Sequence, residues 1–186
     1  MSHFPKLQEA LLYAANLHKG QERDGDAPLP YITHPCEVLS NLRYVGGCQD
    51  EDMLCAAALH DVIEECDADL SELEERFGTR VAALVKELTR VEPTEEQKKG
   101  LSKDEVWQMR AEWLLEEIRT MAPDAQQVKL ADRLSNLREA HRTKGMKKLA
   151  RYEWQSHEIL KIVPREVNPG LWESIAAELA GHSADH

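Results

Sequence analysis

Apolar residues recur every three or four positions along most of this 186-residue chain, and no segment shows a convincing strand-like alternation of apolar and polar residues. The first apolar face is made by Leu7, Ala10, Leu11, Ala14 and Leu17. Helices are predicted at about 5–18, 35–45, 51–65, 69–76, 79–89, 103–121, 124–141, 146–162 and 169–180. The pattern predicts an all-α fold, an irregular helical bundle.

The chain length fits one well-cored domain, and we expect residues 1–186 to form it. No apolar run approaches the ~20 residues that span a bilayer, and the amino terminus lacks the basic and apolar regions of a signal peptide. The four cysteines form no C-x-x-C pair, which favours reduced thiols, and Cys36 is expected to be a small buried thiol rather than a metal ligand. We expect a cytoplasmic protein with no membrane partner.

The formal net charge of −11 argues against a nucleic-acid partner, because nucleic acids are bound by a basic face that displaces counterions from phosphates. A phosphorylated small molecule is compatible with this charge only where a metal ion and a few Arg or Lys side chains offset it locally. The charge carries no prediction of oligomeric state.

A histidine and an aspartate lie near the end of an almost wholly apolar helical segment, Met53–Ile63. A helix that is apolar on every side is buried, and burying an imidazole beside a carboxylate is costly unless a partner compensates. A divalent cation is an efficient partner for His60 and Asp61. The alternative is a chance dipeptide with a satisfied core histidine, and the pair alone does not decide between the two.

Two glutamates follow this pair within one helical turn. Glu64 is four residues from His60, and Glu65 is four residues from Asp61, so in a continuous helix the carboxylates would stack beside the pair. A carboxylate there could take a proton from a water molecule whose pKa a cation has lowered. The alternative is a solvated helix end, although an acidic last turn opposes the helix dipole.

A second apolar helical segment, 128–137, carries Lys129, Asp132 and Asn136 on one face. Asp132 could serve as a metal ligand, with Lys129 and Asn136 directed toward a phosphate or a ribose. The alternative is a surface ion pair between Lys129 and Asp132, which contributes about a few tenths of a kcal/mol.

One further histidine, His34, directly precedes Pro35, which suits the first turn of a helix. We therefore expect His34 at a loop-to-helix junction, from which it can reach inward. Two imidazoles and two carboxylates form a ligand set that suits Mn(II), Fe(II) or Zn(II) and leaves positions for water and substrate. The candidate ligands are His34, His60, Asp61 and Asp132.

The order of these ligands along the chain resembles the HD superfamily of phosphohydrolases. Longer stretches resemble the hydrolase domain of RelA/SpoT proteins, namely Gln21-x-Arg23, Pro30–Pro35, Ala57–Glu64, Phe77-Gly78 and Lys129–Arg138. The resemblance covers about residues 8–160, and the chain ends where a long RelA/SpoT enzyme would continue into its synthetase domain. It is similar to a stand-alone alarmone hydrolase.

The resemblance implies an enzyme that hydrolyses the 3′-pyrophosphate of ppGpp or pppGpp, with Mn(II) held by the four candidate ligands. In this family an acidic pair assists the attacking water, which makes Glu64 and Glu65 the catalytic candidates. Arg23 occupies the place of an arginine that packs on the nucleobase. The other implied contacts, to the ribose or the phosphates of this small-molecule nucleotide, are Lys129, Asn136, Lys147 and Arg151.

Two positions depart from the family pattern: Glu65 replaces an aspartate, and Asp24 replaces a basic residue. The first change adds a methylene to a catalytic arm, and the second removes a positive charge near the substrate. Two alternatives stay open, an HD phosphatase acting on another nucleotide (ppApp, NADPH or a nucleoside phosphate) and a non-catalytic alarmone-binding module. The polar segment 93–103 is interpreted as a mobile flap.

Overall fold

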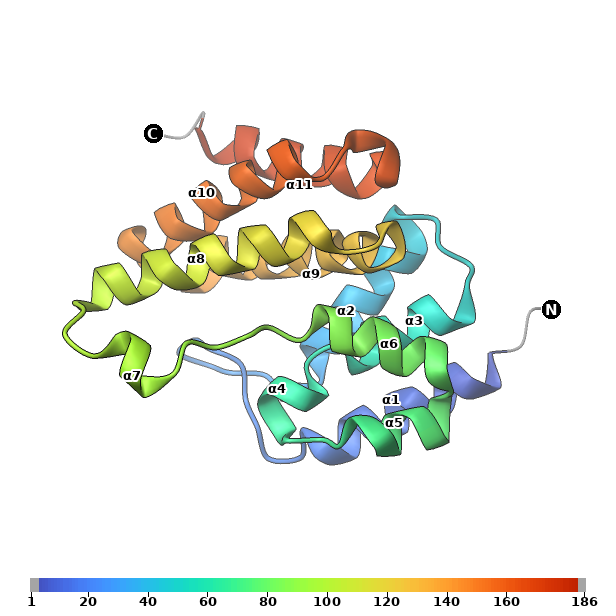
Figure 1. The fold of residues 1–186 in the computed structure, drawn as a ribbon. Coiled ribbons are helices and arrows are strands. Elements are labelled where there is room, and N and C mark those ends of the chain that lie inside the picture. Colours follow the sequence, from blue (N-terminus) through green and yellow to red (C-terminus); the bar gives the residue numbers. More distant parts are fainter. Residues whose placement is uncertain (1–3, 184–186) are drawn as a thin grey trace.

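A computed structural model of the chain describes residues 4–183, and every regular element in that range is a helix (Figure 1). The elements are α1 (Pro5–Leu17), α2 (Thr33–Ser40), the π-helix η1 (Asn41–Val45), α3 (Glu51–Leu59), α4 (Val62–Cys66), α5 (Leu70–Phe77), α6 (Thr79–Leu88), α7 (Glu95–Lys98), α8 (Lys103–Thr120), α9 (Pro123–Thr143), α10 (Met146–Ile162), the 3₁₀ helix η2 (Arg165–Val167) and α11 (Pro169–Ser183). The predicted all-α bundle is confirmed.

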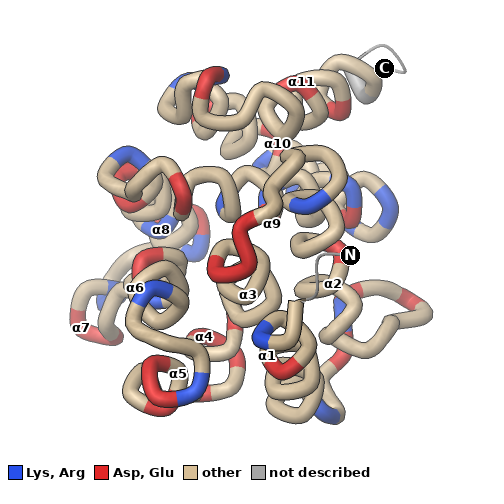
Figure 2. The backbone as a smooth tube through the Cα atoms, turned by 90° about the vertical axis from the view of Figure 1, so that its right-hand side faces the viewer, with Lys and Arg blue, Asp and Glu red and all other residues tan. Residues whose placement is uncertain are grey.

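Two helices, α3 and α9, form the buried centre of the bundle. Residues Met53–Leu59 of α3 are all buried, and the charged residues of this helix are confined to its first turn (Figure 2). The helix packs against α1, α2, α6 and α9, while α10 and α11 cover α9 from the other side (Figure 1). Each fully buried leucine in such a core contributes about 1.5–3 kcal/mol. A polar side chain carried inward by α3 or α9 is therefore held away from solvent.

The predicted helix over 51–65 is in fact two helices, because the chain leaves regular helical geometry at His60 and Asp61. Helix α3 ends directly before this pair, and α4 begins directly after it. Asp61 has φ −101° and ψ −5°, in the bridge region where many active-site residues lie. The expectation that Glu64 stacks on His60 along one continuous helix is wrong. The two glutamates instead reach the site from a separate short helix.

Helix α2 begins two residues earlier than predicted, so His34 lies in its first turn and not before it. The predicted helix over 35–45 ends as the π-helix η1, a wider turn that is frequent near functional sites. His34, Pro35 and Val38 face the core. Cys36 lies on the opposite face because successive helical residues turn by about 100°. The expectation of a buried Cys36 is therefore wrong, since this thiol is exposed.

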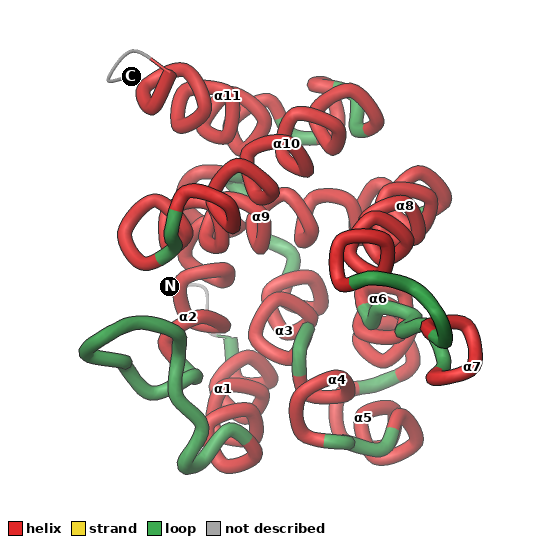
Figure 3. The backbone as a smooth tube through the Cα atoms, turned by 90° about the vertical axis from the view of Figure 1, so that its left-hand side faces the viewer, coloured by secondary structure: helices red, strands yellow, loops and turns green. Residues whose placement is uncertain are grey.

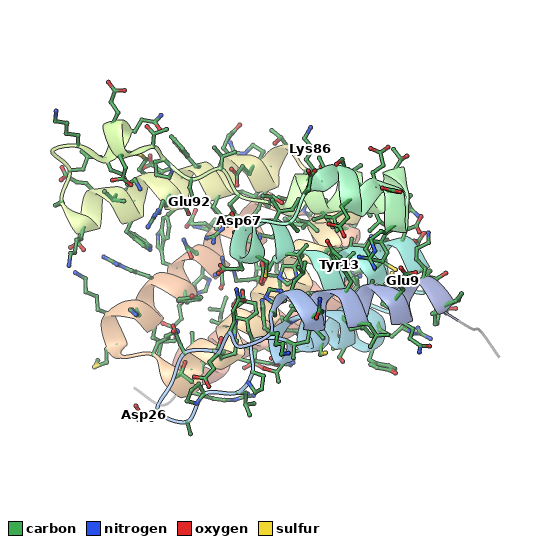
Figure 4. The ribbon with its side chains drawn as sticks, turned by 90° about the horizontal axis from the view of Figure 1, so that it is seen from below. Glu9, Tyr13, Asp26, Asp67, Lys86 and Glu92 are labelled. Atoms are coloured by element: carbon green, nitrogen blue, oxygen red, sulfur yellow. The ribbon has the colours of Figure 1, made fainter. Side chains whose placement is uncertain are left out.

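The long connection between α1 and α2 is folded back on itself (Figure 3). Glu22 and Pro30 form an isolated antiparallel bridge, and the backbone N–H of Arg23 donates to Leu29 O over 2.9 Å. Asp26 lies at the outer end of this loop (Figure 4). The folding back brings Arg23 and its neighbours to the carboxyl-terminal half of α9.

The polar segment interpreted as a flap contains the short helix α7. A capping box closes its first turn, in which the Thr94 hydroxyl accepts from the Gln97 backbone N–H and the Gln97 side chain accepts from the Thr94 N–H. That this segment moves stays a prediction. Among residues 4–183, no helix combines the length and the apolar character needed to cross a membrane.

Candidate metal centre and cavity

Three side chains from separate parts of the fold converge at the bottom of a cavity. His34 comes from α2, His60 from the turn between α3 and α4, and Asp132 from α9. Each offers one ligand atom, and these three atoms lie within 4.8 Å of one another. The residues are 3%, 2% and 6% exposed, respectively. The structure thus brings together three of the four candidate ligands, which lie almost 100 residues apart in the sequence.

The fourth candidate ligand, Asp61, lies beside this cluster. Its Oδ1 atom is 3.1 Å from His60 Nε2, and its Oδ2 atom is 3.5 Å from His34 Nε2. The phenol of Tyr31 donates a 2.7 Å hydrogen bond to Asp61 Oδ2. Burial and the negative charge of Asp61 raise the pKa of Tyr31, so the phenol keeps its proton and remains a donor. We call the four ligand candidates, His34, His60, Asp61 and Asp132, the floor of the site.

The floor has the electrostatics of a cation site. His60 Nδ1 lies 2.9 Å from the acceptor Ala57 O, so Nδ1 carries a proton and Nε2 faces the carboxylates. That Nε2 atom is buried without a well-aligned hydrogen bond, even though Asp61 is close. Burial opposes a charge on His60, but Asp61 and Asp132 outweigh it and raise the pKa of His60 to about 9. The two carboxylates attract positive charge at His60, and together with the two imidazoles they form a ligand set that fits a divalent metal ion.

Two residues of α9 hold Asp132 in place. Lys129 Nζ lies 3.1 Å from Asp132 Oδ2, and the Asn136 side-chain amide donates to Asp132 Oδ1. Lys129 is only 7% exposed, so this is not the surface ion pair considered as an alternative. Although burial favours the neutral acid, Lys129 and the two histidines hold the pKa of Asp132 well below its usual range. Asp132 is therefore ionised, as a metal ligand must be.

The two glutamates of α4 differ in their surroundings. Glu64 accepts a 2.6 Å hydrogen bond from the Arg90 backbone N–H and a 3.1 Å bond from Arg90 Nε. The Glu65 carboxylate has no hydrogen-bond or ion-pair partner among the residues that the structure describes. Although Glu65 is exposed as a residue, the partial burial of its carboxyl group and the charge of Asp61 raise its pKa. Glu65 is thus the carboxylate better able to accept a proton.

Above the floor lies a cavity of 480 Å³ with many basic side chains. The cationic residues that line it are Arg23, Arg90, Arg110, Lys129, Arg133, Lys144, Lys148 and Arg151. The acidic ones are Asp24, Asp61, Glu64, Glu65, Glu92 and Asp132. In a chain of net charge −11, this local excess of positive charge suits a phosphorylated ligand.

We call Arg23, Asp24, Lys144 and Lys148 the rim, because they come from the α1–α2 loop and the α9–α10 junction. Arg23 forms an ion pair with Glu139 of α9, and its guanidinium carbon lies 5.4 Å from the centre of the Tyr31 ring. Asp24 forms an ion pair with Lys144. This acid, which departs from the family pattern, therefore neutralises one lysine of the rim.

Helices α8 and α10 also contribute side chains to the lining of the cavity. The Arg151 guanidinium lies over the Trp107 ring at 4.5 Å, and the Arg133 guanidinium, from α9, lies 5.7 Å from the centre of the Tyr152 ring. Such cation–π contacts hold the guanidinium groups in place. The Arg151 guanidinium also pairs with Asp104, Nη2 to Oδ1, over 2.5 Å, and Arg133 Nη1 donates to Gln155 Oε1 over 3.4 Å, so part of each edge is already engaged.

The structure places the predicted substrate contacts unequally. Arg23, Lys129, Asn136 and Arg151 line the cavity. Lys147 does not line it, and its Nζ atom pairs with Asp104 Oδ1 over 2.9 Å. The next residue of α10, Lys148, lines the cavity instead.

Several cavity residues were not predicted from the sequence. Tyr31 and Arg133 fall inside stretches that resemble the RelA/SpoT hydrolase, so their positions were signalled although their contacts were not. Arg90 and Lys148 carry no such signal, because only the tertiary fold brings them to the cavity.

The fold and the order of the floor residues define an HD-domain protein. The sequence pattern of the HD domain matches residues 10–159, and the chain belongs to this family. It is 38% identical over 141 residues to the guanosine-3′,5′-bis(diphosphate) 3′-pyrophosphohydrolase MESH1 of Mus musculus and, to the same extent, to that of Homo sapiens. Each alignment covers 76% of this chain and 73% of the relative.

Solved structures show the same relationship. One, described as a metazoan orthologue of SpoT that hydrolyses ppGpp, superposes with a TM-score of 0.84 at 28% identity and covers 98% of both chains. Another, a Listeria monocytogenes protein, gives a TM-score of 0.61 at 23% identity, over 81% of this chain and 96% of that one. The second likeness concerns the fold alone.

Proposed function

We propose that this protein is a metal-dependent nucleotide phosphohydrolase that converts ppGpp to GDP and pyrophosphate, with Mn(II) as its metal. The observation that carries the proposal is the convergence of His34, His60 and Asp132 at the base of a cavity rich in basic side chains. The names of the relatives support the choice of ppGpp as substrate. Asp61, 3.1 Å from His60, completes the proposed ligand set.

A bound divalent cation supplies Lewis acidity, which lowers the pKa of a water molecule and offsets phosphate charge. The remaining tasks fall to side chains of this chain. Glu65 accepts the proton of the attacking water, because its carboxylate is unpaired and its pKa is raised toward the working pH. Glu64, tied to Arg90, orients the segment that carries Glu65 and remains the second candidate for proton transfer.

The substrate phosphates and base have separate partners in this proposal. Lys129 and Arg151 face the cavity and meet phosphate oxygens, which removes the need for water to solvate that charge. Asn136 reaches the ribose or a phosphate, and Arg23 packs on the base. Lys147 was expected to share this work, but its place outside the cavity makes Lys148 the better candidate.

Product analysis tests the proposal. The Mn(II)-loaded protein is incubated separately with ppGpp, ppApp and NADPH, and the products are separated by anion-exchange chromatography. Release of pyrophosphate and GDP from ppGpp is expected. Release of orthophosphate without pyrophosphate would contradict the 3′-pyrophosphohydrolase assignment. Tight binding of ppGpp without turnover would instead indicate a non-catalytic alarmone-binding module.

One observation favours a second candidate substrate class. Asp24 lines the cavity where the family pattern has a basic residue, and it also engages Lys144. This arrangement leaves less positive charge at the rim, as would suit a nucleotide with fewer phosphate charges, such as NADPH. The adenine analogue ppApp, which differs from ppGpp in its base and not in its phosphates, is the other candidate. A higher kcat/KM for either of these than for ppGpp in the same assay would establish it.

We also propose that residues 1–186 form a single HD-type hydrolase domain and that the protein acts in the cytoplasm. Helix α11, which extends beyond the matched HD region, packs against α9 and so shares its core. All four cysteines are free thiols, as is usual in a reducing compartment.

A further inference from the structure

Behind the floor, the side chains of His34, Ser135 and Glu37 form a hydrogen-bonded chain that runs from α2 to α9 and back to α2. His34 Nδ1 lies 3.0 Å from Ser135 Oγ, and the Ser135 hydroxyl lies 2.9 Å from Glu37 Oε2. His34 and Glu37 are one turn apart on α2, while Ser135 reaches them from α9. Ser135 is fully buried. None of these contacts is used in the proposed hydrolysis.

The direction of this chain follows from counting protons. A carboxylate can only accept hydrogen bonds, so the single hydroxyl proton of Ser135 is donated to Glu37. The hydroxyl oxygen must then accept from His34, which requires the His34 proton to be on Nδ1. The His34 Nε2 atom is left with its lone pair, 3.3 Å from Asp132 Oδ1 and 3.5 Å from Asp61 Oδ2.

The second imidazole of the floor has its Nδ1 proton fixed by a different kind of acceptor. His60 Nδ1 faces the backbone carbonyl of Ala57 at 2.9 Å, an acceptor that no side-chain substitution removes. A backbone carbonyl cannot donate, whereas a serine hydroxyl can rotate and donate to an imidazole nitrogen. The tautomer of His34 therefore needs a second group to fix the hydroxyl, and Glu37 is that group.

We propose that Glu37, acting through Ser135, is a positioning residue that sets the His34 tautomer and thereby the affinity of the floor for a divalent metal ion. The inference rests on the proposed metal site and adds two residues to it. Groups that orient a metal-binding histidine in this way typically change metal affinity or activity by about 10–100-fold when removed. Glu37 is not among the residues that line the cavity, and its hydrogen bond goes to Ser135.

The test is a titration with Mn(II), in which electron paramagnetic resonance measures the free ion. It is carried out on the wild-type full chain and on four variants, Glu37→Ala, Glu37→Gln, Ser135→Ala and Glu75→Ala. Glu37→Ala should weaken Mn(II) binding about 10–100-fold. Glu37→Gln, whose amide oxygen can still accept from Ser135, should stay within about threefold of wild type, because a retained acceptor preserves the relay. Glu75→Ala, which removes an exposed acid on α5, is the charge-matched control and should bind as wild type does.

A second readout reports the tautomer itself. In the metal-free, histidine-¹⁵N-labelled protein, His34 should show a protonated Nδ1 and an unprotonated Nε2, and Glu37→Ala should add the opposite tautomer. Thermal unfolding in EDTA separates this effect from a loss of folding, and Ser135→Ala provides an independent break of the same chain.

The possible results test the positioning role of Glu37 and the proposed metal site separately. Unchanged Mn(II) affinity and an unchanged His34 tautomer in Glu37→Ala and Ser135→Ala would overturn the positioning role and leave the proposed function intact. An equal loss of Mn(II) affinity in Glu37→Gln and Glu37→Ala would mean that Glu37 acts through its negative charge and not through its hydrogen bond to Ser135. A wild-type protein that binds no Mn(II) would overturn the proposed metal site, and the inference with it.

Discussion

The floor and the rim of the cavity are built on different physical principles. The floor residues are largely buried and are fixed by partners within the core, such as Lys129 for Asp132 and Ala57 O for His60. At the rim, the Asp24 side chain is 71% exposed, and its ion pair with Lys144 competes with water and salt. In the proposed function, the buried floor sets the chemistry, and the more exposed rim adjusts which nucleotide is accepted.

The sharpest way to break this comparison is to remove one acid from each region. Asp61→Ala should abolish metal retention and lower activity by about 10³-fold or more, because several kcal/mol of transition-state stabilisation are lost. Asp24→Ala should retain the metal, since this acid contacts only the rim. Metal content by mass spectrometry and initial rates check both variants. Full activity of the purified Asp61→Ala protein would refute the floor as the metal site.

Within α4, the two glutamates should respond differently to the same change. Glu65→Gln keeps the size and removes the basicity, so kcat should fall about 10²–10⁴-fold with metal content unchanged. Glu64→Gln should have a smaller effect, because Glu64 is already neutralised by Arg90. Single-turnover rates separate this step from product release. The reverse order of effects would assign proton transfer to Glu64.

The pH dependence of kcat/KM should follow the Glu65 carboxyl group. Its pKa is raised by burial and by Asp61, so the group holds its proton to a higher pH than an ordinary glutamate does. Proton acceptance requires the ionised form, and the rate should therefore fall about tenfold per pH unit below that pKa and level off above it. The profile is measured at saturating Mn(II). An acid limb that survives in Glu65→Gln would have to come from another group.

The smallest effect is expected at the rim, where substitutions of two adjacent lysines can be compared. Lys148→Ala should raise KM roughly fivefold, since one cation near a phosphate contributes about 1 kcal/mol in a solvated site. Lys147→Ala is the matched control and should leave KM unchanged, because Lys147 lies outside the cavity and pairs with Asp104. Steady-state kinetics at fixed ionic strength distinguish the two. Equal effects would mean that the rim acts only through its overall charge.

The sequence predicted the buried floor of the site better than it predicted the rim. Polar residues inside apolar helical segments, such as His60 and Asp132, signal a cost of burial that a ligand must offset, so they can be found without coordinates. The end of α3 at His60 was missed because apolar periodicity runs through the break. The choice between Lys147 and Lys148 depends on how α10 turns against α9, which one sequence alone does not contain.

The ion pair of Arg23 with Glu139 joins residues 116 positions apart and fixes a long, flexible side chain during folding. Ordering a free arginine costs about 2 kcal/mol of rotamer entropy. A nucleobase that stacks on this guanidinium meets a side chain that is already ordered. Binding the base therefore does not cost most of the Arg23 rotamer entropy. The folded α1–α2 loop therefore preorganises Arg23 before a ligand binds.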